Sequence, residues 1–125
     1  MIYSINKPIG WTSFDVVKKI RGITREKKVG HAGTLDPFAE GVLIIGTGKD
    51  TKKLTSISSS IKSYRAILKL GKTTDTLDNE GEVTNKMDVP TFDKVKIENV
   101  LISFKGDYLH MPPMYSAKRV KGVRL

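Results

Sequence analysis

A glycine-rich segment, residues 30–41, sets the strongest limit on how this chain can fold. It reads GHAGTLDPFAEG, with three glycines and one proline within twelve residues. Glycine weakens helices and strands, and proline removes a main-chain donor, so this composition cannot sustain a regular helix or a central strand. We predict a loop, around which the flanking regular elements pack.

The residues on either side of this loop carry periodic patterns of apolar side chains. Residues 1–7 alternate apolar and polar, which predicts a short strand. Thr12 or Ser13 can cap a helix over about residues 14–23, because a hydroxyl there accepts an otherwise unpaired main-chain N–H. One face of that helix carries Val16, Val17, Ile20 and Ile23. Residues 41–45 predict a buried strand.

The middle of the chain predicts further elements. Residues 51–57 indicate a short polar helix, and residues 61–71 give the clearest strand pattern of the sequence, with alternating apolar side chains that include Tyr64. Residues 82–85 are predicted to pair back as a hairpin arm.

The last third predicts one more helix and two more strands. Thr91 is a candidate cap for a helix that Gly106 would end. Residues 107–125 predict a strand, a turn at two prolines and a second strand. Because strands and helices mix without a regular β-α-β alternation, we expect an α+β fold with a mixed, largely antiparallel sheet flanked by helices.

The charge balance points to a polyanionic partner. The sequence has 22 Lys+Arg and 13 Asp+Glu, a net charge of +9. Such an excess in a globular chain indicates nucleic acid most often. The alternative is that the clusters at 18–28 and 118–124 are merely solvated faces. The candidate contacts to an RNA backbone are Lys18, Lys19, Lys28, Lys118, Arg119 and Lys121.

Composition also excludes several classes of site. The chain has no cysteine and two histidines, which excludes disulfide scaffolds, thiolate zinc sites and cysteine nucleophiles. A metal site would need mainly carboxylates. The longest aliphatic run, residues 42–45, is far too short for a transmembrane helix. We therefore expect a cytoplasmic protein with no membrane association.

Asp36 is the candidate catalytic group that the residues themselves suggest. It is the one carboxylate within the otherwise uncharged run from His31 to Ala39. Gly33 permits a close approach of another chain or a ligand to the main chain. An Asx-type turn is the commoner role of an isolated Asp-Pro pair, and spacing alone favours that interpretation.

Several segments, taken in order, resemble one enzyme family. They are NKPIGWTS at 6–13, GHAGTLDPFAEGVL at 30–43, KSYRA at 62–66, LGKTTDTLD at 70–78 and PPMYSAKRVKG at 112–122. Together they closely resemble the catalytic domain of the TruB-type tRNA pseudouridine synthases, relatives of the dyskerin/Cbf enzymes. The resemblance covers essentially the whole chain, and the segment at 30–43 is its most specific part.

The resemblance implies roles for individual residues. Asp36 matches the catalytic aspartate of the family. His31 matches a histidine that enters the RNA loop and helps to hold the target nucleotide out of the stack, and Tyr64 matches the tyrosine that stacks on the flipped base. The residues alone also allow His31 to bridge main-chain groups of the loop, and Tyr64 to belong to the core. Lys7 and Pro8 match a pair that shapes the catalytic loop, to which Gly33 also belongs. The family uses no cofactor and no metal.

The function implied is conversion of a T-loop uridine of tRNA, position 55 in the family's naming, to pseudouridine. The alternative is a non-catalytic RNA-binding or chaperone module on the same fold. The family also uses an arginine and an aliphatic wall residue from a later segment, so residues 1–125 are expected to be the N-terminal part of a single catalytic domain. The rest of that domain and a C-terminal RNA-binding extension would be absent. We expect this fragment to be inactive alone, and the full-length protein to be a monomer.

Overall fold

The computed structural model describes residues 1–109, 119–120 and 123–124. The chain divides into two compact units, residues 1–65 and 66–125. Within the described residues, no helix is long and apolar enough to cross a membrane.

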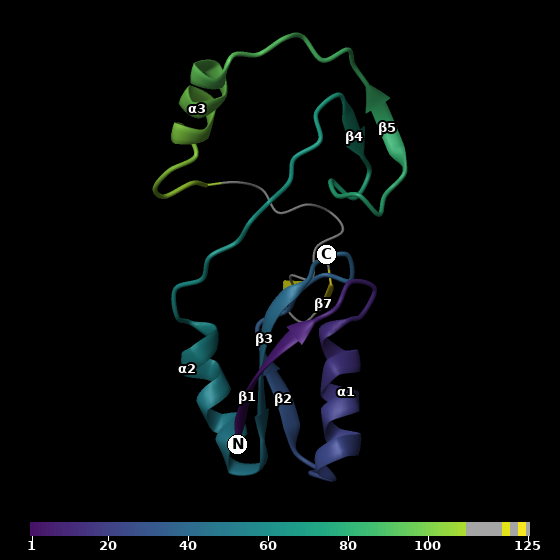
Figure 1. Ribbon diagram of the computed structural model, residues 1–125, viewed down its shortest axis with the longest axis vertical. Coiled ribbons are helices and arrows are strands. Elements are labelled where there is room, and N and C mark those ends of the chain that lie inside the picture. Colours follow the sequence, from purple (N-terminus) through teal and green to yellow (C-terminus); the bar gives the residue numbers. More distant parts are fainter. Residues whose placement is uncertain (110–118, 121–122, 125) are drawn as a thin grey trace. The chain divides into compact units, whose positions relative to one another are not determined.

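A three-stranded antiparallel sheet forms the centre of the first unit. Its strands are β1 (Ile2–Lys7), β2 (Val29–Ala32) and β3 (Gly41–Thr47), in the order β1-β3-β2 (Figure 1). The strands predicted at 1–7 and 41–45 are confirmed. The prediction that the loop begins at residue 30 is wrong, because residues 30–32 belong to β2. Gly30 lies opposite Gly46 there, so pairing with β3 overrides the low strand propensity of glycine.

Helix α1 (Ser13–Thr24) covers one face of this sheet. Thr12 is its N-cap and Asp15 completes a capping box, in which each side chain binds the other residue's main-chain N–H. The Thr12 hydrogen bonds hold the pKa of Asp15 below its ordinary value. The buried cluster of the unit consists of Val16, Val17, Leu43 and Ile45. Ile23, which was expected on the buried face, is 67% exposed, since it lies in the last turn of the helix.

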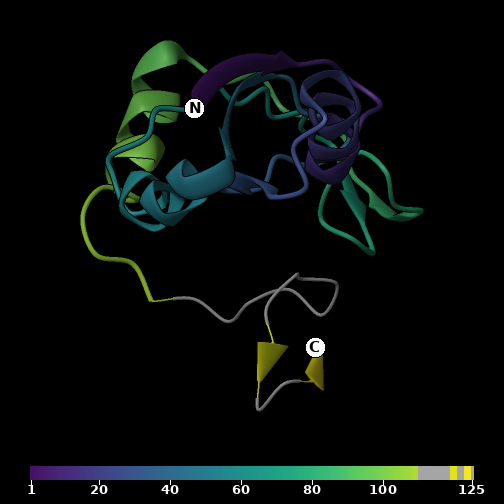
Figure 2. The ribbon, with the colours of Figure 1, turned by 90° about the horizontal axis from the view of Figure 1, so that it is seen from below.

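Two short helical segments follow β3, the 3-10 helix η1 (Gly48–Lys53) and α2 (Leu54–Ser58). They replace the single helix predicted at 51–57. The Leu54 side chain is buried against Gly30 and Gly46, where a Cβ atom would lie 3.1–3.2 Å from it. Gly46 and the neighbouring Ile45 point to opposite faces of β3. Helix α2 therefore packs on the face opposite α1, as the two views of the ribbon show (Figures 1 and 2).

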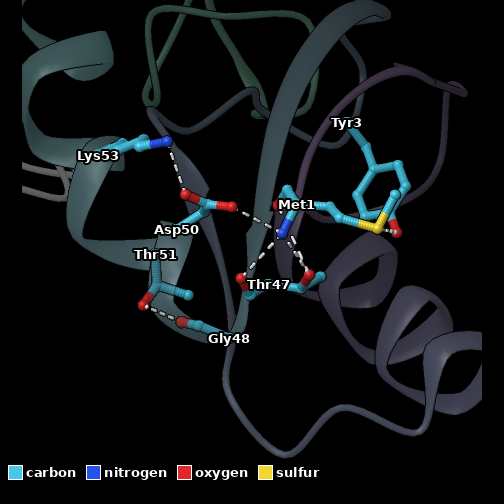
Figure 3. A network of polar contacts seen from close by, with 7 residues as sticks. All are labelled: Met1, Tyr3, Thr47, Gly48, Asp50, Thr51 and Lys53. Carbon is cyan, nitrogen blue, oxygen red and sulfur yellow. Dashed lines mark hydrogen bonds and ion pairs between the residues drawn. The ribbon is translucent and has the colours of Figure 1, made fainter.

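A network of polar contacts joins the start of β1 to the end of β3 (Figure 3). The α-ammonium group of Met1 donates to the carbonyl and the hydroxyl oxygen of Thr47, at 3.2 and 3.1 Å. It also pairs with Asp50 at 3.0 Å, and Lys53 pairs with the other oxygen of that carboxylate at 2.7 Å. Lys53, followed by the Met1 ammonium, lowers the pKa of Asp50.

The strand predicted at 61–71 is not formed. Residues 61–69 have no regular secondary structure in the described part of the chain, and their side chains are exposed. A strand is stabilised by main-chain hydrogen bonds to a neighbour. The alternating pattern of this segment has no such partner among the described residues.

The second unit contains a small hairpin and a helix. Strands β4 (Lys72–Thr74) and β5 (Val83–Lys86) pair antiparallel, which confirms the hairpin arm expected at 82–85. Helix α3 (Lys94–Ile102) has Asp93 as its N-cap and no buried residue. The prediction of Thr91 as the cap is wrong, because the Asp93 carboxylate accepts the Lys96 amide at 2.6 Å.

The C-terminal strands are β6 (Arg119–Val120) and β7 (Val123–Arg124), which pair antiparallel. The predicted turn at Pro112 and Pro113 lies outside the described residues. All strand pairs among the described residues are antiparallel. The α+β fold class is thus confirmed.

Candidate functional site

Asp36 lies in the loop that joins β2 to β3, and its side chain is exposed. Its main-chain carbonyl accepts the Ala39 amide at 3.0 Å. Its carboxylate forms no hydrogen bond or ion pair with another described residue. An Asx-type turn would use the carboxylate as the acceptor, whereas this turn uses the main chain. The carboxylate is therefore available to an external group.

A buried lysine supports the loop on its C-terminal side. Lys7, the last residue of β1, is 0% exposed. Its ammonium donates to the carbonyl oxygens of Pro8 and Trp11, at 3.0 and 2.6 Å, and lies 3.5 Å from that of Pro37. The Gly10 amide also donates to the Pro37 carbonyl, at 2.7 Å. The residue after Asp36 is thereby connected to the segment that leaves β1.

A buried serine holds the loop on its N-terminal side. Ser13 is 3% exposed. Its hydroxyl accepts the Leu35 amide at 2.9 Å and donates to the Leu35 carbonyl at 3.2 Å. The sequence indicated this residue only as a candidate helix cap, because its partner lies 22 residues away. Since Thr12 caps α1, the Ser13 hydroxyl is free to bind the loop.

His31 lies in β2, half-buried and opposite Ile45 of β3. Its Nδ1 donates to the carbonyl oxygen of Gly33. Gly33 has a φ of +89°, a conformation that favours glycine. The imidazole therefore bridges its strand to the loop, and in the neutral ring this bond leaves Nε2 as an acceptor.

No described contact places Tyr64 beside Asp36 or His31. Its side chain is 75% exposed, which contradicts the alternative interpretation of this residue as part of the core. No hydrogen bond or ring contact among the described residues joins it to Asp36 or His31. It lies near the end of the first unit, six residues beyond α2.

The basic candidates of the first unit are exposed. Lys18 and Lys19 lie on α1, beside an open surface hollow that is also lined by Gly10, Trp11, Asp15, Gly22 and Ile23. Lys28 directly precedes β2. None of these three lysines forms a salt bridge with a described residue. Lys118 and Lys121 lie outside the described residues, and of Arg119 only the main chain, in β6, is described.

A metal centre has no candidate in the same part of the chain. Across residues 1–109, 119–120 and 123–124, no group of three or more His, Asp or Glu side chains could hold a metal ion.

Known proteins give a consistent set of matches. The chain is 48% identical over 99% of its length to tRNA pseudouridine synthase B of Clostridium acetobutylicum, and 52% identical over 99% to that of Clostridium kluyveri. It spans 43% of each of these relatives.

A solved structure is also similar. It is the crystal structure of a Cbf5-Nop10-Gar1 complex, with a TM-score of 0.61 and 28% identity. The match covers 94% of this chain and 30% of that one. Residues 21–125, which include the Asp36 loop, match the family described as TruB family pseudouridylate synthase (N terminal domain). The chain therefore belongs to the TruB family of pseudouridylate synthases.

Proposed function

We propose that this chain is the Asp36-bearing part of a tRNA pseudouridine synthase, which isomerises the T-loop uridine at position 55. The observation that carries the proposal is the exposed carboxylate of Asp36, on a loop whose main chain is held by Lys7 and Ser13. The names of the relatives, which are tRNA pseudouridine synthases B, support the reaction and the class of substrate.

The chemistry of pseudouridine formation explains why a single carboxylate, that of Asp36, could suffice. Pseudouridine formation breaks the glycosidic bond between ribose carbon C1′ and base nitrogen N1, and forms a new bond from C1′ to carbon C5 of the base. A proton then leaves C5 and N1 gains one, so the reaction is an isomerisation that consumes no cofactor. An ionised carboxylate can add to C1′ or to C6, or can stabilise an electron-poor sugar. Tyr64 would stack on the flipped base and assist the proton transfer from C5.

The remaining residues would hold the RNA. A base inside a folded RNA must leave its stack before it reacts, and the ring of His31 would occupy the space that the base vacates. Pro8 and Gly33 would shape the loop together with Lys7. Phosphate contacts would come from Lys18, Lys19 and Lys28, and from Lys118, Arg119 and Lys121.

The test compares two substitutions in the same loop of the full-length protein. Asp36→Asn removes the proposed catalytic charge, and Glu40→Gln removes an exposed charge four residues later. The substrate is an unmodified tRNA transcript, with a second transcript that carries cytidine at position 55 as the specificity control. We expect Asp36→Asn to lower turnover more than about a hundredfold, with tRNA affinity within a few-fold of wild type. Glu40→Gln should retain turnover.

Three other results of this experiment would each contradict a different part of the proposal. Conversion by Asp36→Asn at more than about a hundredth of the wild-type rate would contradict a catalytic role for this carboxylate. Tight binding of tRNA by the wild-type protein without any pseudouridine would instead favour the non-catalytic RNA-binding module. Conversion of a uridine other than position 55 would correct the substrate assignment alone.

A further inference from the structure

The Ser13 hydroxyl does more than satisfy a buried polar group. Ser13 begins α1, and its single oxygen binds both main-chain groups of Leu35, the residue directly before Asp36. The Leu35 side chain packs against the buried cluster of the first unit. Leu35 is thus held through its amide, its carbonyl and its side chain.

The contacts of Leu35 fix the peptide group that leads into Asp36. The carbonyl carbon of Leu35 and the nitrogen of Asp36 belong to one planar peptide. A hydrogen bond to that carbonyl therefore restrains the plane from which the Cα–Cβ bond of Asp36 departs. The Asp36 carboxylate forms no hydrogen bond or ion pair with another described residue, so the contacts of the neighbouring main chain are the described restraints on where its side chain starts.

We infer that Ser13 is a positioning residue for Asp36, which sets the direction in which the carboxylate leaves the loop. The inference rests on the proposed function, because only a reaction at Asp36 makes this direction consequential. A reacting group that is displaced by about 1 Å loses up to a hundredfold in rate. On the other side of Asp36, Lys7 and Gly10 hold the loop through the Pro37 carbonyl, and these contacts do not involve Ser13.

The test is a kinetic comparison in the full-length enzyme with an unmodified tRNA transcript. Ser13→Ala removes the hydroxyl. Thr47→Val is the matched control, because Thr47 is also 3% exposed, its hydroxyl also binds main-chain or terminal groups, and it lies at the end of β3 away from the loop. We expect Ser13→Ala to lower kcat about 10- to 100-fold, with KM and tRNA affinity unchanged. Thr47→Val should keep kcat within about twofold.

A second pair of variants covers the case in which Ser13→Ala does not fold. Ser13→Thr and Ser13→Val have nearly the same shape and differ in the hydroxyl, so any strain from the added atoms is common to both. A kcat at least tenfold higher for the threonine variant would support the inference.

Equal kcat values for the threonine and valine variants would overturn the inference. So would a Ser13→Ala enzyme with unchanged kcat, or one whose loss of kcat and of melting temperature is matched by Thr47→Val. These results leave the proposed function intact, whereas a wild-type enzyme that forms no pseudouridine would overturn both.

Discussion

Replacement of Lys7 by methionine tests whether a buried charge supports the Asp36 loop. The substitution keeps most of the side-chain volume but removes the three donors of the ammonium. The Pro37 carbonyl retains the Gly10 amide, whereas the carbonyls of Pro8 and Trp11 are deprived of the ammonium, which lies 3.0 and 2.6 Å away. Each hydrogen bond from a charged donor contributes about 1.5–3 kcal/mol.

Removal of the buried charge offsets part of that destabilisation, because no carboxylate among the described residues pairs with Lys7. We therefore expect the free energy of unfolding to fall by about 2–3 kcal/mol. Lys7→Arg is the matched control for charge. The planar guanidinium cannot direct its donors as a tetrahedral ammonium does, so we expect this variant to be destabilised as well.

The stability assay is urea denaturation of the full-length protein, monitored by circular dichroism. Hydrogen exchange is measured for the amide protons of residues 35, 36, 38 and 39, since Pro37 has none. We expect lower midpoints for both variants and faster exchange of the Ala39 amide, which binds the Asp36 carbonyl. A Lys7→Met protein within about 0.5 kcal/mol of wild type, as for an exposed substitution, would refute the argument. Wild-type stability of Lys7→Arg would show that charge matters and geometry does not.

Two further predictions concern the lysine cluster of Lys18, Lys19 and Lys28, and the glycine-rich loop. We expect a weaker salt dependence of tRNA binding when glutamine replaces Lys18, Lys19 and Lys28. The slope of log affinity against log salt concentration should fall in magnitude by about 2–3, because each lost phosphate contact contributes about 0.7–0.9. The control substitution of Lys49, Lys52 and Lys62 by glutamine should leave this slope unchanged. Equal slopes for both triple variants would mean that Lys18, Lys19 and Lys28 are merely solvated. Gly33→Ala should lower the free energy of unfolding by about 1–2 kcal/mol, because Gly33 has a φ of +89°. Steric crowding does not contribute, since an added Cβ atom would meet nothing within 4 Å. Gly22→Ala, inside α1 and equally unobstructed, should instead stabilise the protein by up to about 1 kcal/mol, and a neutral Gly33→Ala in thermal unfolding would contradict the argument from φ.

The elements that the sequence predicted correctly are those whose signals are local. Strand β1 and helix α1 follow from apolar spacing and from the hydroxyl at Thr12. Strand β2 has no such signal. Its glycine, Gly30, pairs with Gly46 of β3, and that pairing between distant parts of the sequence overrides propensity. The segment at 61–71 shows the converse, since a clear alternation does not produce a strand without a partner.

The candidate site divides in the same way. Asp36 and His31 are indicated by the specific run of residues that surrounds them, and their roles remain predictions. The support of the loop by Ser13 could not, because a hydrogen bond between residues 22 positions apart leaves no periodic trace. Lys7 was matched as a supporting residue by resemblance alone. No pattern in the sequence indicates that its ammonium is fully buried and surrounded by carbonyl oxygens.

The packing of Leu54 against Gly30 and Gly46 limits where Tyr64 can lie. Two facing glycines leave a flat place on the sheet, and the leucine side chain occupies it. That contact holds α2, whose last residue, Ser58, starts the segment that leads to Tyr64. Six residues span at most about 20–22 Å, so the Cα atom of Tyr64 stays within that radius of the helix end. A methyl group added at Gly46 would lie 3.1–3.2 Å from the Leu54 side chain. Any shift of α2 that relieves this contact would move the region that Tyr64 can reach, without a change to the tyrosine itself.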